Sequence, residues 1–162
     1  MTDTVSVGVA LRPVRDSDLD VLFRQMSDAE SVQMAAFTSE DPWDRQRFDT
    51  HMARVRRSPE VTLRAVTRDG EVVGSISGFV VEGDTEITYW IDRHAWGQGV
   101  ASQALALFLR DLRTRPLHAR AASDNAGSLR VLEKAGFRAI GTEVSFAPAR
   151  DAEIEETILR LD

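Results

Sequence analysis

Two β-rich runs separated by a two-residue turn signal constrain the fold of this chain more than any other feature. The runs cover residues 61–67 and 71–81, and Asp69-Gly70 stands between them. Both residues of this pair tolerate positive φ angles, which a tight two-residue hairpin turn requires. The pattern therefore predicts an antiparallel β-hairpin in the middle of the chain.

The rest of the chain alternates between strand-like and helix-like patterns. Ser17 is expected to cap the first helix with Asp20 three positions on, and Asp41-Pro42 is typical of the start of a second helix. A less regular stretch reaches Glu40 between them. The other expected elements are strands at 5–11, 86–92, 117–122, 137–146 and 153–161, and helices at 100–115 and 125–135.

This order gives seven strands and four helices, with no internal repeat and no interdomain linker. A chain of 162 residues falls in the usual range for one domain. We therefore expect residues 1–162 to form a single domain of the α/β (α+β) class. It should contain a mixed, mostly antiparallel sheet of about seven strands, flanked by about four helices.

Composition excludes several classes of function. The sequence has no cysteine, so a thiol nucleophile, a thiolate metal site and a disulfide are excluded. A net charge of −6 opposes the phosphate neutralisation on which nucleic-acid binding depends. Apolar runs fall short of the roughly 20 residues that a membrane span needs, and the start lacks a signal-peptide pattern. We expect a cytoplasmic protein without nucleic-acid or membrane partners.

A glycine-containing turn connects a predicted strand directly to a predicted helix. It runs from Arg93 to Ser102 and includes Gly97 and Gly99, which let the backbone turn tightly with its N–H groups inward. The N-terminus of a helix carries roughly half a positive charge and unpaired N–H donors, so a diphosphate can bind there without a lysine. The turn predicts a phosphate site, with a loop that binds no ligand as the alternative.

Two other glycine-rich phosphate motifs fail in this context. A dinucleotide-binding fold should carry an acidic residue at a strand end roughly 20 residues after the turn, where this chain has residues 117–121, Leu-His-Ala-Arg-Ala. A Walker-type loop requires Gly-Lys-Ser/Thr, which does not follow the turn.

Three segments together carry a resemblance to a known family. They are Leu11-Arg12-Pro13 through Leu19, Glu86-Ile87-Thr88-Tyr89-Trp90-Ile91 through Leu105, and Ser123-Asp124-Asn125 through Phe137. On these segments the chain resembles the GNAT superfamily of N-acetyltransferases, in particular its RimJ/RimL-like branch, whose members acetylate protein N-termini and various small amines. The correspondence runs over nearly the whole chain.

The resemblance implies a V-shaped split between the fourth and fifth strands, in which acetyl-CoA lies as co-substrate. Backbone groups at the end of the fourth strand would pair with the pantetheine arm, and those of the glycine turn would bind the diphosphate. The implied cofactor-binding residues are Trp90, Ile91, Asp92, Trp96, Gly97, Gln98, Gly99, Val100, Ala101, Ser102 and Asn125.

The chain departs from the family pattern at two positions. Trp96 replaces the Gln or Arg that is usual in the wider superfamily, although an aromatic residue is common in the RimJ/RimL-like branch. Leu132 stands where many members have a tyrosine that protonates the departing thiolate. Tyrosine-based acid catalysis is therefore not available at that position.

Glu86 and Ser128 are the candidate catalytic residues. Acetyl transfer to an amine requires a neutral nucleophile and a route for its proton, and Glu86 could take that proton directly or through water. A solvent-facing carboxylate at a strand end is the alternative. Ser128 could donate to the leaving thiolate, or could merely serve the helix backbone. Asn125 could also cap the last helix, and Tyr89, the only tyrosine, is expected to pack on the other face of its strand.

These assignments predict an acyl-CoA-dependent N-acetyltransferase acting on a protein or peptide N-terminal amine. The alternatives are a small amine such as an antibiotic, amino acid or polyamine, and a non-catalytic acyl-CoA-binding module. The three histidines lack ligand spacing, so no metal is expected. Met34, Phe37 and Trp43 lie in the region that family members use to shape the acceptor pocket. The closing strands leave an edge that a homodimer could cover.

Overall fold

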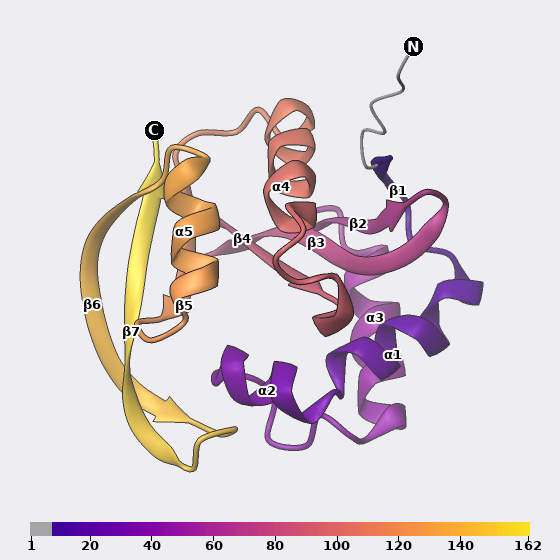
Figure 1. The fold of residues 1–162 in the computed structure, drawn as a ribbon, viewed down its shortest axis with the longest axis horizontal. Coiled ribbons are helices and arrows are strands. Elements are labelled where there is room, and N and C mark those ends of the chain that lie inside the picture. The colour runs from indigo at the N-terminus through magenta and orange to yellow at the C-terminus, as the bar shows by residue number, and fades with distance from the viewer. Residues whose placement is uncertain (1–7) are drawn as a thin grey trace.

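The computed structural model describes residues 8–162, which form one mixed sheet of seven strands with helices on both faces (Figure 1). The strand order is β1-β2-β3-β4-β5-β7-β6, and only β4 and β5 pair in parallel. The sheet expected from the sequence is confirmed. Its strands are β1 (Val9–Arg12), β2 (Thr62–Arg68), β3 (Glu71–Val81), β4 (Asp84–Ile91), β5 (Leu117–Ala122), β6 (Arg138–Ala147) and β7 (Ala152–Leu161).

Two groups of helices cover opposite faces of the sheet. On one face, α4 and α5 enclose the largest core cluster, in which Phe108 and Leu132 pack against Ile87 and Ile91 of β4. On the other face, α1 and α3 pack over β2 and β3 around Leu22 and other apolar side chains. The helices are α1 (Leu19–Met26), α2 (Ala29–Ala35), α3 (Arg45–Arg57), α4 (Val100–Asp111) and α5 (Ala126–Lys134), with 3-10 helices η1 (Asp16–Asp18) and η2 (Arg93–Ala95).

The central hairpin forms as the turn residues predict. Arg68 of β2 pairs with Glu71 of β3, and the two turn residues Asp69 and Gly70 adopt φ angles of 52° and 86°. Gly136 likewise ends α5 with a φ angle of 105°, a backbone conformation that glycine adopts without strain. The hairpin prediction and the end of the last helix are confirmed.

The region expected to be irregular contains a fifth helix, α2. Asp28 caps it by accepting hydrogen bonds from the Ser31 backbone N–H (3.1 Å) and from the Ser31 hydroxyl (2.9 Å). The helix has only seven residues and a weak apolar pattern, so the sequence alone does not predict it. Residues 8–162 thus contain five α-helices, where about four were expected.

Four expected boundaries were also wrong or incomplete. The second helix does not start at Asp41-Pro42 but at Arg45, with Asp44 as its N-cap. Ser17 does not cap α1 but lies inside η1, because the Asp18 carboxylate accepts from Arg12 (2.7 Å) and from the Arg15 N–H (2.8 Å) and fixes this turn. The helix expected to reach Arg115 ends at Asp111, where the chain becomes extended. The first strand begins at Val9, and residues 5–7 of the expected strand lie outside the described residues.

The sheet opens between its fourth and fifth strands, as the resemblance implied. Only Thr85 with Leu117 and Glu86 with His118 pair across this junction. Beyond them β4 stays bonded to β3 and β5 stays bonded to β7, so the two arms separate. Within residues 8–162, no strand pairs with β4 over residues 87–91 on the β5 side.

Gly74 of β3 has no room for a side chain, because a Cβ there would collide with the backbone carbonyl of Trp90. We predict that Gly74→Ala lowers the free energy of unfolding by about 1–3 kcal/mol, measured by urea denaturation. Gly141→Ala is the matched control, since nothing lies within 4 Å of the added methyl group. It should be neutral or stabilising by up to about 1 kcal/mol. Equal stability of the two variants would contradict the close contact.

Candidate active site in the sheet opening

The turn from β4 to α4 leaves backbone N–H groups of the helix N-terminus without side-chain partners. Gly97 and Gly99 adopt φ angles of 75° and 78°, which favour glycine. Gly99 is the N-cap of α4, and no side chain caps the helix there. The first amides of α4 are therefore available to an anion, and the helix dipole favours a negative charge at this end.

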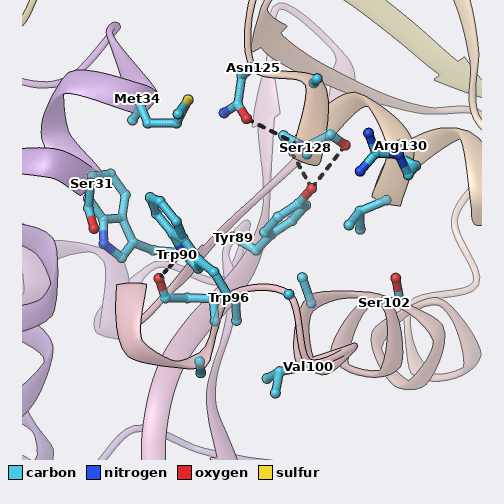
Figure 2. A pocket seen from close by; sticks show the side chains of 18 of the residues that line it. Ser31, Met34, Tyr89, Trp90, Trp96, Val100, Ser102, Asn125, Ser128 and Arg130 are labelled. Carbon is cyan, nitrogen blue, oxygen red and sulfur yellow. Dashed lines mark hydrogen bonds between the residues drawn. The ribbon is translucent and has the colours of Figure 1, made fainter.

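A cavity of about 500 Å³ lies between this turn, the open edge of β4 and α5 (Figure 2). It brings together ten of the residues predicted to form the site. They are Trp90, Ile91, Trp96, Gly97, Gly99, Val100, Ala101, Ser102, Asn125 and Ser128. Most of the residues predicted from the sequence to form the site therefore line one cavity.

Three predicted residues do not line this cavity. The Asp92 carboxylate accepts from the His94 N–H (3.0 Å) and caps η2. The Gln98 side chain donates to the His94 carbonyl (3.1 Å) and accepts from Arg68. Both side chains thus stabilise the turn. The third residue is Glu86, which lies at the apex of the split, in the last residue pair that joins β4 to β5.

Glu86 belongs to a cluster of charges on the sheet face opposite α4 and α5. Its Oε1 accepts from Nε of Arg120 at 3.3 Å, and Arg120 also contacts Glu143 and Glu156 at 3.3 Å. The Glu86 side chain is 19% exposed. Burial raises the pKa of Glu156, while its hydrogen bond to Arg120 opposes this shift. Three carboxylates surround one guanidinium, so this face attracts positive charge.

Two tryptophans fix the β4 side of the cavity. The Trp90 indole donates to the Gln25 carbonyl of α1 at 2.9 Å, and the Trp96 indole donates to the Ile91 carbonyl at 2.9 Å. The Ile91 carbonyl, one of the backbone groups assigned to the pantetheine arm, therefore already accepts one hydrogen bond within the chain. Its second lone pair is the one left for a ligand.

Asn125 and Ser128 stand on the α5 side. Asn125 caps α5, since its Oδ1 accepts from the Ser128 N–H at 3.2 Å. The capping role weighed for Asn125 is thereby confirmed, and the residue also lines the cavity. The Ser128 hydroxyl lies 2.9 Å from the hydroxyl of Tyr89 on β4 (Figure 2). This contact joins the two arms of the split.

Helix α2 lies across the cavity and is tied to both arms. Its Ser31, Met34 and Ala35 line the space. On the β4 side, Arg93 binds the capping Asp28 at 2.8 Å and holds the pKa of that carboxyl far below its usual range. On the other side, Arg150 donates to the carbonyl of Gln33 (2.7 Å) and binds Asp124 (2.7 Å), which also lines the cavity.

Residues 9–138 match the family model described as the acetyltransferase (GNAT) domain. This chain belongs to the GNAT acetyltransferase family. A probable N-acetyltransferase of Bacillus subtilis (strain 168), YjcK, is 29% identical over 106 residues. That alignment covers 60% of this chain but only 59% of the relative, so the chain accounts for less than two thirds of that protein's length.

Solved structures share the fold over almost the whole chain. An N-acetyltransferase from Staphylococcus aureus Mu50 superposes with a TM-score of 0.83 at 20% identity, covering 96% of this chain and 98% of that one. RimJ of Mycobacterium smegmatis, in complex with CoA-disulfide, gives 0.81 at 22%, covering 94% and 81%. Spermidine N-acetyltransferase from Vibrio cholerae, in complex with CoA and spermine, gives 0.79 at 14%, covering 94% of each. At such identities the likeness establishes the fold.

The sequence analysis did not predict that Tyr89 lines the cavity of this GNAT domain. Tyr89 does lie on the β4 face expected for it, with Ile87 and Ile91, but its ring reaches the cavity and its hydroxyl meets Ser128. Burial raises its pKa. Leu132, at the position of the family tyrosine, is 1% exposed and belongs to the core. Alternation along β4 could locate Tyr89 on this face, but not its partner on α5.

Arg130 and Lys134 were also missed. Both line the cavity from α5, where they stand one helical turn apart. The cavity thus combines the uncapped N-terminus of α4, two cationic side chains and apolar walls. This set of groups fits a ligand with phosphates at one end and a thin uncharged arm. A basic pair at i and i+4 in the last helix was the available signal in the sequence.

Two kinds of site have no support within residues 8–162. In that range no three His, Asp or Glu side chains gather as metal ligands would. The helices there are also too short or too polar to cross a membrane.

We predict that Arg130→Gln and Lys134→Gln each weaken binding of coenzyme A about two- to fivefold, as measured by calorimetry. Exposed charge pairs contribute about 0.2–1 kcal/mol, and the loss should shrink as salt is added. Arg110→Gln, at the C-terminal end of α4, makes the same change of charge away from the cavity and serves as control. An equal effect of all three variants would show that only net charge matters.

Proposed function

We propose that this GNAT domain transfers an acetyl group from acetyl-CoA to a primary amine, and that its preferred acceptor is the N-terminal amine of a protein or peptide. The observation that carries the proposal is the cavity in the sheet opening. It joins an anion-binding end, formed by the uncapped N-terminus of α4, to a pair of hydroxyl groups at Tyr89 and Ser128.

The donor binds along the open edge of β4. The amides from Gly97 to Ser102 hold the diphosphate, with Arg130 and Lys134 facing it from α5. The pantetheine arm lies against the unpaired edge of β4 and places the thioester near the apex of the split. Unpaired backbone groups of a strand require partners, and an extended amide-containing arm supplies them.

The transfer needs a proton to leave the amine and a proton to reach the sulfur. The amine nitrogen attacks the thioester carbonyl, an N–C bond forms, and the C–S bond breaks with its electron pair going to sulfur. Glu86 takes the proton from nitrogen, directly or through water, and Arg120 orients its carboxylate. Ser128 stands on the sulfur side of the cavity.

Features of the acceptor side favour a peptide. Thr88, in the middle of β4, is exposed on the face that also carries Glu86 and Trp90, so an extended acceptor has access there. The resemblance of the sequence to the RimJ/RimL-like branch supports the same choice. A polyamine is the second candidate, because Glu143 and Glu156 surround Arg120 beside Glu86 and attract multiple positive charges.

A non-catalytic acyl-CoA-binding module is the remaining alternative. It was motivated by Leu132 in the position of the family tyrosine. The hydroxyl pair formed by Tyr89 and Ser128 offers another proton donor in the same cavity, which supports an active enzyme over a module. Measuring thiol release from acetyl-CoA across panels of peptides and small amines separates the three possibilities.

We place the enzyme in the cytoplasm, where acetyl-CoA is available to it. A homodimer through β6 is part of the proposal, because this edge strand exposes Ile140, Val144 and Phe146.

We predict that Glu86→Gln lowers kcat by about 10²–10⁴, the usual contribution of an aligned general base. Thiol release with the best acceptor of the panel measures it. Glu143→Gln removes the same charge from the same guanidinium, but its side chain is 55% exposed and lies on β6. This control should keep most of the activity. An unchanged rate in Glu86→Gln would reject Glu86 as the base.

A further inference from the structure

The contact between Tyr89 and Ser128 has two possible proton arrangements. The Tyr89 hydroxyl lies 2.9 Å from Oγ of Ser128 and 3.3 Å from the backbone carbonyl of the same residue. If tyrosine donates to the carbonyl, the serine hydroxyl can donate to tyrosine and is occupied. If tyrosine donates to Oγ, the serine keeps its own hydrogen free for the cavity. The second arrangement prepares Ser128 to donate to a ligand.

We propose that Tyr89 supplies, through Ser128, the proton that the departing thiolate of coenzyme A requires. This inference rests on the proposed acetyl transfer and names the source of its second proton. In this proposal Ser128, which lines the cavity, donates to the sulfur, and Tyr89 acts through Ser128 as a positioning and proton-supplying residue (Figure 2).

Acidity explains why the serine needs the tyrosine. An alkyl thiol has a pKa near 8.5 and a phenol near 10, whereas an aliphatic alcohol is a far weaker acid than either. A lone serine would therefore lose its proton to a thiolate only at a high energetic cost. When Tyr89 transfers a proton to Oγ in the same step, the net donor is the phenol. Burial raises the pKa of Tyr89, which keeps the phenol protonated and makes it a weaker acid than a free phenol, yet still a far stronger one than serine.

Other groups around the cavity are less suited to this task. Leu132 is buried in the core and carries no proton. Lys134 also lines the cavity, but it lies six residues beyond Ser128 on α5, about 9 Å further along the helix. The chain contains no cysteine and no second tyrosine.

Protons and electrons are conserved in the proposed step. The C–S bond breaks and its electron pair goes to sulfur, which takes the hydroxyl proton of Ser128. The serine oxygen takes the proton of Tyr89, so a tyrosinate remains while Glu86 holds the proton from the amine. Before the next turnover Glu86 releases its proton to solvent and the tyrosinate regains one from solvent, so both residues return to their starting states, and no oxidation or reduction occurs.

A purely structural role makes a different prediction. The hydroxyl pair also ties β4 to α5, so its loss could simply widen the split and weaken donor binding. In that case KM for acetyl-CoA would rise and the acidity of the phenol would be irrelevant. The two roles are therefore separated by kcat, by KM and by phenol acidity.

The first test compares Tyr89→Phe, Ser128→Ala and the double variant by thiol release. We expect each single variant to lower kcat about 10²-fold or more, with KM for acetyl-CoA changed less than about twofold. The double variant should be no slower than the slower single variant, because both act in one relay. Effects that multiply in the double variant, or a loss confined to KM, would overturn the relay.

The second test uses the fact that Tyr89 is the only tyrosine in the chain. Biosynthetic replacement of tyrosine by 3-fluorotyrosine or 3,5-difluorotyrosine lowers the pKa of this one phenol with little change in size. We expect kcat to vary systematically with the phenol pKa, as for a general acid. A kcat that does not change on fluorination would overturn the relay, since a structural hydrogen bond does not require a transferable proton.

Thr157→Val is the control for a lost hydroxyl contact. Thr157 of β7 lies 2.7 Å from the Ser123 hydroxyl, away from the cavity, and its removal should leave kcat within about twofold. If wild-type protein turns over normally and Tyr89→Phe does too, the relay alone fails. If wild-type protein binds coenzyme A but releases no thiol with any acceptor, the proposed function fails and the relay fails with it.

Discussion

The site depends on how little of β4 pairs with β5. Two residue pairs join these parallel strands, whereas β4 makes eight pairs with β3 and β5 makes six with β7. Each of the two strands is thus fully paired with its outer neighbour, whereas the edges that face each other across the split are mostly unpaired. The backbone groups exposed in the gap must be satisfied by water or by a ligand. A gap of this kind selects ligands that can pair with a strand edge, and the glycine turn at its mouth adds the preference for an anion.

Polar contacts across the gap set its shape, because the sheet does not. Tyr89 and Ser128 join the two arms in the interior, and α2 joins them at the mouth through Arg93 on one side and Arg150 on the other. Beside α2, Ala36, Ala122 and Ala147 form a small cluster whose short side chains let the segments approach closely. The cavity is therefore bounded by a few specific contacts, and single substitutions should affect it strongly.

Local signals in the sequence predicted most of the fold. The hairpin at Asp69-Gly70 and the turn with Gly97 and Gly99 follow from backbone conformations that these residues favour, and the split followed from the family resemblance. Helix α2 was missed because it has only seven residues, and the contact of its capping Asp28 with Arg93, 65 residues away, is not visible in the local sequence. The Glu86 cluster was missed for a similar reason, since its four members come from four strands. The alternation of residues along a strand predicts which face of the sheet a side chain lies on, but it does not predict which side chain of another element it contacts there.

Tyr89 and Leu132 show how one chemical requirement can be met from either arm of the same split. A proton donor must reach the sulfur, and nothing in that requirement fixes which element carries it. In this chain the helix position is filled by Leu132, which packs in the core with Phe137 and Leu159, so a polar group there would lose its solvent without gaining a partner. The facing strand carries the only tyrosine, and Ser128 extends its reach from α5. We infer that absence of the family tyrosine moves the acid to the opposite arm and does not by itself indicate loss of catalysis.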